Sequence, residues 1–189
     1  MKKLIITLLF FLILNACQPI EKVNHIVFDN SQFDNFNILS NYIEIKEIFE
    51  KKISDPYIGH TLEINPSERI FSWINDNFKP IGNENNFNVA ILDASITQTQ
   101  FENKEAKNFD EKSNYIYELF YLLEFSLFDD SGNLVASTLV ETSRSTTSGI
   151  YISIQEKDNI IDDLIYNSLV DISNETKKLL INYMANYIL

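Results

Sequence analysis

Hydrophobic residues alternate with other residues along the stretch 115–128, and this is the clearest pattern in the chain. Side chains of a β-strand point alternately to its two faces, so a period of two predicts one strand face laid on a hydrophobic core. The even positions mix apolar with acidic side chains, so the second face is not cleanly polar. The odd positions, all apolar or aromatic, are Tyr115, Tyr117, Leu119, Tyr121, Leu123, Phe125 and Leu127.

Other segments are rich in the β-branched and aromatic residues that favour strands. The string DDSGN at 129–133 has the composition of a tight turn, and it predicts a hairpin between 115–128 and the segment that follows. A charged stretch at 102–114 precedes that hairpin, and a loop is expected at 51–65. The further predicted strands are 26–28, 37–48, 88–100 and 134–144.

Two segments have the helical period and start signals of helices. Asn65 can accept hydrogen bonds from the first free amides, Pro66 suits the first helical position, and Glu68 suits the third. Ser153 and Glu156 form a capping box before a long amphipathic pattern. The element order ββαβββα predicts an α+β fold, with an antiparallel sheet of about five strands and two helices packed on one face.

The first residues have the pattern of an export signal. Lys2 and Lys3 are followed by an uncharged apolar run at 4–14, and small or polar residues then lead to Cys17. A membrane-spanning helix needs about 20 apolar residues, and this run is too short. We therefore expect residues 1–16 to be a signal peptide.

The string Leu14-Asn15-Ala16-Cys17 resembles the lipobox of bacterial lipoproteins. The resemblance implies that a diacylglyceryl group is attached to the Cys17 thiol and that acyl chains such as palmitate anchor the protein in a membrane. Residues 17–22 would then be a lipidated tether, and 23–189 a single α+β domain. Because Gln18 stands where the enteric sorting rule requires aspartate for retention at the inner membrane, we expect the outer membrane, with the domain facing the periplasm.

Charge restricts the partners. The formal net charge of −12 includes Lys2 and Lys3, so the chain without its signal carries −14. Such a polyanion is a poor binder of nucleic acid, and anionic headgroups would repel it, so the lipid rather than a basic patch must hold it to the membrane. With one cysteine, the chain cannot form a disulfide framework.

At the level of architecture, the chain resembles the YajG-like envelope lipoproteins and the auxiliary lipoproteins of ABC-type lipid transporters. The shared features are the lipobox, a capped helix, a three-stranded meander and a long terminal helix. Uncharacterised lipoproteins share a DPY…H loop before a P-x-E helix start, seen here as 55–60 and 66–68. The resemblance implies an accessory role in the cell envelope, and it transfers no functional residue besides Cys17.

Candidates for catalysis are few. A Ser-His-Asp site could combine His60, Asp55 and a serine from 143–148, but no nucleophile elbow or glycine-lined oxyanion site accompanies them. No phosphate-cradling loop or metal-ligand spacing is present, and the acidic turn at 129–133 lacks the alternation and closing glutamate of a calcium loop. The sequence predicts a non-enzyme without cofactor or metal, and a hydrolase is the less favoured alternative.

The mixed face of 115–128 predicts an interaction surface. Its apolar members would otherwise be exposed to solvent, and contiguous exposed apolar surface usually marks a partner or ligand site. The alternative is that the loop 102–114 or 51–65 covers this face. We expect a binding or accessory module whose partner is an envelope protein or a lipid, or alternatively an auxiliary lipoprotein of a lipid ABC transport system. The candidate surface residues are Ile116, Phe120, Leu122 and Phe128.

Overall fold

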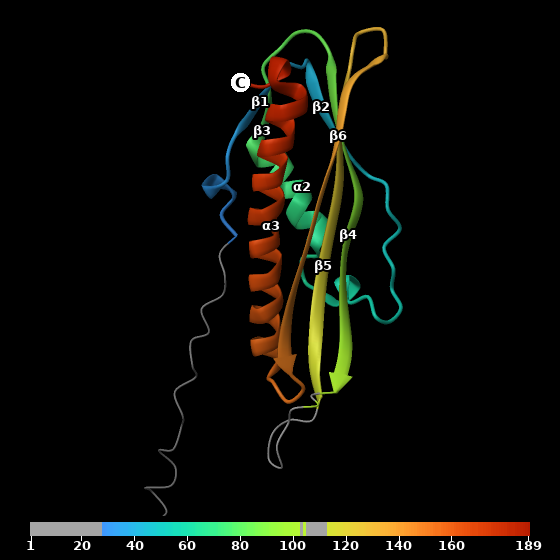
Figure 1. The fold of residues 1–189 in the computed structure, drawn as a ribbon, viewed down its shortest axis with the longest axis vertical. Coiled ribbons are helices and arrows are strands. Elements are labelled where there is room, and N and C mark those ends of the chain that lie inside the picture. Colours follow the sequence, from blue (N-terminus) through green and yellow to red (C-terminus); the bar gives the residue numbers. More distant parts are fainter. Residues whose placement is uncertain (1–27, 103, 105–112) are drawn as a thin grey trace, which may run out of the picture.

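A computed structural model describes residues 28–102, 104 and 113–189 (Figure 1). In this part of the chain, two α-helices and six β-strands are joined by loops and short 3-10 turns. The elements are β1 (Phe36–Ile38), β2 (Tyr42–Glu47), α2 (Pro66–Asn77), β3 (Phe78–Pro80), β4 (Asn86–Glu102), β5 (Ser113–Phe128), β6 (Leu134–Gly149) and α3 (Ile154–Met184).

The strands form two sheets rather than the single antiparallel sheet that the sequence predicted. Strands β4, β5 and β6 form the expected antiparallel meander, but β2 joins β4 in parallel. The reason is the crossover through α2, which carries the chain back to the end of the sheet where β2 began. Strands β1 and β3 pair in parallel as a separate two-stranded sheet. The α+β class and the two helices are as predicted.

The predicted strand at 37–48 is divided by a tight bend. Ser40 is buried there, and its amide donates to the Ile38 carbonyl at 2.8 Å. Gly82 packs directly against the bend, because a Cβ at this position would lie 2.8 Å from backbone atoms of Leu39 and Ser40. The close approach requires glycine. Gly82 therefore supports the bend, while helix α2 already ends at Asn77.

Both helices start where the sequence predicted. The Asn65 side chain accepts from the Glu68 amide at 3.0 Å, and Pro66 is the first residue of α2. The Ser153 hydroxyl accepts from the Glu156 amide at 3.1 Å at the start of α3. Each cap satisfies an amide that has no partner within its helix.

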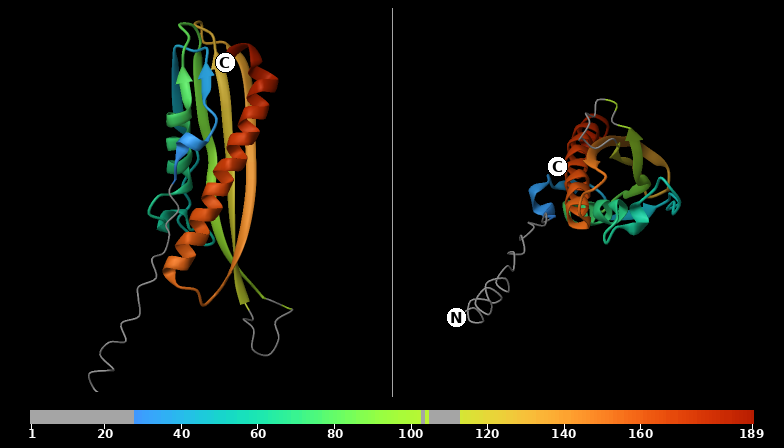
Figure 2. Two further views of the ribbon diagram at one scale, coloured as in Figure 1. Left: turned by 90° about the vertical axis from the view of Figure 1, so that its left-hand side faces the viewer. Right: turned by 90° about the horizontal axis from the view of Figure 1, so that it is seen from below.

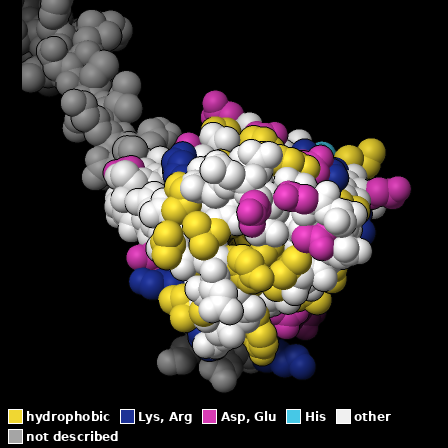
Figure 3. Space-filling view, turned by 90° about the horizontal axis from the view of Figure 1, so that it is seen from above, with side chains coloured by type: hydrophobic (Ala, Val, Ile, Leu, Met, Phe, Trp, Pro, Cys, Tyr) yellow, Lys and Arg dark blue, Asp and Glu magenta, His cyan; other side chains and the backbone are white. Residues whose placement is uncertain are grey.

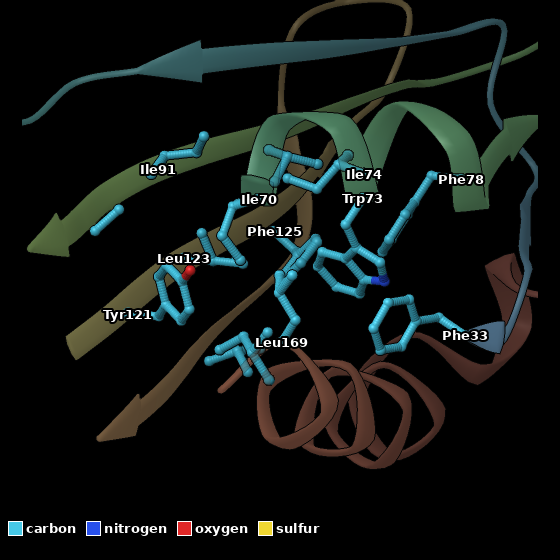
Figure 4. Close-up of a cluster of buried hydrophobic side chains, with 14 of the residues drawn as sticks. Phe33, Ile70, Trp73, Ile74, Phe78, Ile91, Tyr121, Leu123, Phe125 and Leu169 are labelled. Carbon is cyan, nitrogen blue, oxygen red and sulfur yellow. The ribbon is translucent and has the colours of Figure 1, made fainter. Parts of the chain in front are cut away.

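One hydrophobic core lies between the four-stranded sheet and the helices. Seen along the long axis in Figure 2, the sheet curves, and α2 and α3 lie on its concave side. Trp73 of α2, Phe125 of β5 and Leu169 of α3 meet in this core, and the Trp73 ring packs edge-on to Phe78 with centroids 5.4 Å apart (Figure 4). The odd residues 117–127 of β5 are at most 1% exposed, as the alternation predicted.

No helix within the described ranges is both long and apolar enough to cross a membrane. Residues 1–27 lie outside the description. The predicted signal peptide, the lipidation site Cys17, the tether and most of the predicted strand at 26–28 fall there.

Candidate functional site

Strand β4 has two different partners along one edge. Strand β2 accompanies it only as far as the pair Glu47 and Ile91, after which the Ile48 amide donates to the Ile91 carbonyl at 3.0 Å. Further along the same edge, Tyr57 pairs with Thr97 in an antiparallel bridge. The loop between β2 and α2 thus leaves the edge of β4 and returns to it, as Figure 1 shows to the side of β4.

A β-bulge lies where β2 ends. The register between β4 and β5 shifts from Ile91 to Asp93, so Leu92 is the extra residue on β4. After the bulge, Ala94 and Ile96 occupy the core face. The bulge changes the direction of β4 at the point where it loses its neighbour.

Backbone hydrogen bonds define which groups of β4 face this edge. The Ile58 amide donates to the Ile96 carbonyl at 3.0 Å, and the Gln98 amide donates to the Pro56 carbonyl at 2.8 Å. In an antiparallel strand, the amide and carbonyl of one residue point to the same side, and the side alternates along the chain. The amide and carbonyl of Ala94 and the amide of Ile96 therefore face the gap between the two partner segments.

A cleft of about 280 Å³ opens at this gap. The loop after β2 forms one wall, the start of α2 forms another, and β4 forms the third. We call it the edge cleft. Its lining residues are Phe49, Glu50, Lys51, Lys52, Tyr57, Gly59, His60, Asn65, Pro66, Ser67, Asp93, Ala94, Ser95 and Ile96.

Charged groups stand at the rim of the edge cleft. The Lys52 ammonium donates to the Tyr57 hydroxyl at 2.8 Å, and this hydrogen bond raises the pKa of Lys52. The negative charge of Asp93 acts in the same direction. The Lys51 Nζ atom lies 3.2 Å from Oε1 of Glu47 and forms an ion pair with it. The rim thus holds both signs of charge, in contrast to the strongly acidic chain as a whole.

Asp93 lines the edge cleft and has one unsatisfied oxygen. Its Oδ1 atom is buried, and no described atom donates a hydrogen bond to it. A buried acceptor without a partner costs free energy, so a rotation of the Asp93 side chain that turns this oxygen toward a donor of a bound ligand would recover that cost. Asp93 is therefore a polar group available for recognition.

The wall on the side of α2 is held rigidly. The Tyr121 hydroxyl is completely buried and donates to the Pro66 carbonyl at 3.4 Å. Burial raises the pKa of Tyr121, so the phenol keeps its proton. The Ser67 hydroxyl donates to Asn65 Oδ1 at 2.6 Å. These contacts fix the first turn of α2 against the sheet.

The structure does not bring together the serine, histidine and aspartate considered for hydrolysis. His60 is exposed in the 3-10 turn Gly59–Thr61, beyond the β4 edge of the sheet. The serines of 143–148 are on β6, at the opposite edge, so β4 and β5 lie between them and His60. Adjacent strands are about 4.8 Å apart, which leaves the two groups beyond hydrogen-bonding reach.

The predicted interaction surface lies on the sheet face away from the helices. Its four residues are partly buried rather than fully exposed. Phe120 lies between Ser95 of β4 and Ser143 of β6, and Leu122 lies between Asp93 and Glu141. Since Asp93 and Ser95 also line the edge cleft, this surface is continuous with the cleft. The partly buried residues are Ile116, Phe120, Leu122 and Phe128.

The most exposed large hydrophobic residues lie elsewhere. Tyr151 and Ile154 are each 82% exposed near the start of α3, Ile53 is 75% exposed in the loop between β2 and α2, and Leu189 is 73% exposed at the last residue. Figure 3 views the end that carries the hairpin turn and the C-terminus, where hydrophobic and acidic side chains are interspersed. The sheet face is thus one of several surfaces with apolar side chains.

Sequence reasoning missed the edge cleft, although one signal for it was present. In β4 the buried hydrophobic positions change phase, from Val89 and Ile91 to Ala94 and Ile96. A strand without a bulge keeps one parity, so the change marks an inserted residue. No comparable pattern marks Tyr57 as a strand partner, because a single bridge has no periodicity.

Comparisons with known proteins give no family. No protein-family model matches the chain, and no curated protein matches it. A minor lipoprotein from Acinetobacter baumannii has a similar structure, with 8% sequence identity and a TM-score of 0.43. The aligned region covers 72% of this chain and 90% of that lipoprotein. A neuraminyllactose-binding hemagglutinin homolog from Helicobacter pylori is similar at 12% sequence identity and a TM-score of 0.36. The aligned region covers 73% of this chain and 84% of that homolog.

Proposed function

We propose that this protein is a lipid-anchored binding module of the bacterial cell envelope and that its ligand occupies the edge cleft. The single observation that carries the proposal is the cleft itself, a concavity with apolar walls, backbone groups facing into it and the unsatisfied Asp93 oxygen. Binding sites typically combine these features. The module would be attached through Cys17, at the outer membrane and facing the periplasm.

A binding role fits the cleft better than catalysis. The Lys52 ammonium is engaged with Tyr57, and its pKa is raised, so it is a poor base or nucleophile. His60 stands at the rim, with the serines of 143–148 at the far edge of the sheet. We therefore propose a non-enzyme that needs no cofactor or metal.

An auxiliary lipoprotein of a lipid ABC transport system is the second candidate. The observation that favours it is that Phe120 and Leu122 adjoin Ser95 and Asp93 of the edge cleft, so they would offer apolar contacts to a lipid beside the cleft. In that case a lipid would be handed along this face, and the partner would be a transporter subunit.

Photo-crosslinking in cells tests the proposed function. A photoreactive amino acid is placed at Ser95, which lines the cleft, or at Ser143, which flanks Phe120 from the other strand and lies outside the cleft. We expect specific adducts from position 95 and none from position 143. Equal adducts at both positions, or none at either, would contradict a ligand in the cleft.

The anchor is tested separately. Cys17→Ser should abolish labelling with a palmitate analogue and leave the protein unprocessed or released, because the serine hydroxyl cannot form the thioether. Processed Cys17→Ser protein that still fractionates with membranes would contradict the lipid anchor. The outcomes of the two experiments are independent, because Cys17→Ser tests membrane attachment and photo-crosslinking tests the ligand in the cleft.

A further inference from the structure

We infer that the ligand of the edge cleft is an extended peptide segment, which adds to the sheet as a short strand between Ile48 and Ile58. This inference rests on the proposed function, because it assumes that the cleft is the binding site. It goes further by naming the chemical class of the ligand and the backbone groups that it meets.

The first argument is the pattern of backbone groups. On both sides of the gap, the same edge of β4 already binds backbone, through the Ile91 carbonyl and through Ile96 and Gln98. Between them, Ala94 presents one donor and one acceptor, and Ile96 presents a second donor. A peptide in extended conformation offers donors and acceptors at the same spacing, as in strand addition to a sheet edge.

The second argument is the size of the gap. Ile91 and Ile96 are separated by a bulged stretch of strand, which spans roughly 15 Å at about 3.3 Å per residue. About four residues of an extended chain fit this length. The cleft volume of about 280 Å³ suits a short segment and excludes a folded domain.

The third argument excludes an acyl chain as the occupant. A hydrocarbon chain in the cleft would cover Ala94 and Asp93 without forming hydrogen bonds, which leaves buried polar groups unsatisfied. A peptide satisfies Ala94 with its backbone and can donate to Asp93 Oδ1 from a side chain. Phe49 and Tyr57 offer apolar contacts to the alternate side chains.

The test uses a displayed library of random hexapeptides against the mature protein purified from membranes in detergent. An enriched peptide is synthesised, and amide hydrogen exchange is followed in the free and bound protein. We expect slower exchange at Ala94 and Ile96 and unchanged exchange at Val140, which lies in β6. N-methylation of alternate peptide nitrogens should weaken binding about three- to tenfold each, as expected for one lost hydrogen bond.

Matched variants locate the peptide. Asp93 and Glu141 both pair with Leu122, but Asp93 alone of these two lines the cleft. Asp93→Ala should lower the affinity for the peptide about three- to tenfold, because the peptide loses one hydrogen-bond acceptor, while Glu141→Ala should leave it unchanged. Both variants are checked for an unchanged circular dichroism spectrum and cooperative unfolding. Because N-methylation alters only the peptide, that part of the test stands even if a variant does not fold.

Three results would overturn the inference: a library without enriched peptides, an enriched peptide that leaves Ala94 and Ile96 unprotected, or protection of these amides by oleate in place of peptide. If any of these occurs while crosslinks at Ser95 persist in cells, the cleft is a binding site for another ligand and the proposed function stands. If the crosslinks are also absent, the proposed function fails as well.

Discussion

The two faces of β5 contain similar residues but have different environments. Tyr121, Leu123 and Phe125 on the inner face are fully buried between the sheet and the helices. Phe120 and Leu122 on the outer face are only partly buried, beside small or acidic residues of β4 and β6. Aromatic and aliphatic character alone therefore does not identify the core; the layer that packs against each face does.

The largest expected difference between the faces is in stability. Phe125→Ala should lower the free energy of unfolding by about 3–5 kcal/mol, because it leaves a cavity in a closed core. Phe120→Ala should cost about 1 kcal/mol, in proportion to its partial burial. Urea unfolding of both variants measures the difference. Equal losses would mean that the outer face is itself an enclosed core.

Much of the fold could be predicted from local sequence. The alternation in β5, the Asn65 and Ser153 caps and the turn at 129–133 are all encoded by residues close to one another. The pairing of β2 with β4 is not encoded locally, because it depends on the length and direction of the connection through α2. The same holds for β1 and β3, which are separated by α2 and the long loop.

The candidate site was less predictable than the fold. The residues of the predicted surface are located from periodicity, but the edge cleft needs Tyr57, Asp93 and Ser67 to meet from three separate segments. His60 was considered from its residue type, and it does lie at the rim. The other residues of the cleft lie near His60 only through tertiary contacts, which the order of residues along the chain does not reveal.

The second prediction concerns partner capture by the outer face. The double variant Phe120→Ser, Leu122→Ser should unfold with a free energy about 2 kcal/mol lower, since two partly buried side chains are lost. It should also abolish the crosslinks formed from Ser95, because both residues adjoin the cleft. The measurements are urea unfolding and crosslink yield in cells.

A matched control removes apolar side chains further from the cleft. Leu134 and Leu139 of β6 are each 57% exposed. Their double replacement by serine should change stability by less than about 1 kcal/mol and leave the crosslinks intact. Loss of the crosslinks in this control as well would show that general hydrophobicity, and not the surface beside the cleft, retains the partner.

The third prediction tests the helices that cover the inner face. Asn65→Ala and Ser153→Ala should each lower the free energy of unfolding by about 1 kcal/mol, because an amide at the helix start loses its acceptor. Asn167→Ala, within α3, should change it by less than about 0.5 kcal/mol. Thermal or urea unfolding measures all three. Cap variants as stable as the parent would mean that packing alone fixes the helix starts.

The smallest expected effect on stability comes from the turn at 129–133 between β5 and β6. This turn determines which side chains of β6 lie on each face of the sheet. The Asp129 carboxylate accepts from the Asn133 side-chain amide at 2.9 Å and from the backbone amides of Asn133 and Ser131 at 2.8 and 2.9 Å. These hydrogen bonds, with that of the Asn133 side chain the largest cause, lower the pKa of Asp129 from 3.8. The ionised carboxylate therefore stabilises the folded state above its unfolded pKa, and this contribution disappears as the pH falls through the lower folded value.

Asp129→Asn keeps the shape of the side chain and removes its charge, so it isolates this contribution. The variant should be less stable than the parent at about pH 7, and the difference should shrink as the pH falls below about 4, the ordinary pKa of an aspartate, and through the lower folded value. Asp130→Asn is the control, because its side chain accepts from the Asn85 amide and takes no part in the hydrogen bonds within the turn. Urea unfolding across this pH range is the measurement. A difference that stayed constant down to about pH 3 would show that shape rather than charge holds the turn, and the two faces of β6 would then owe their register to packing against β5 and α3.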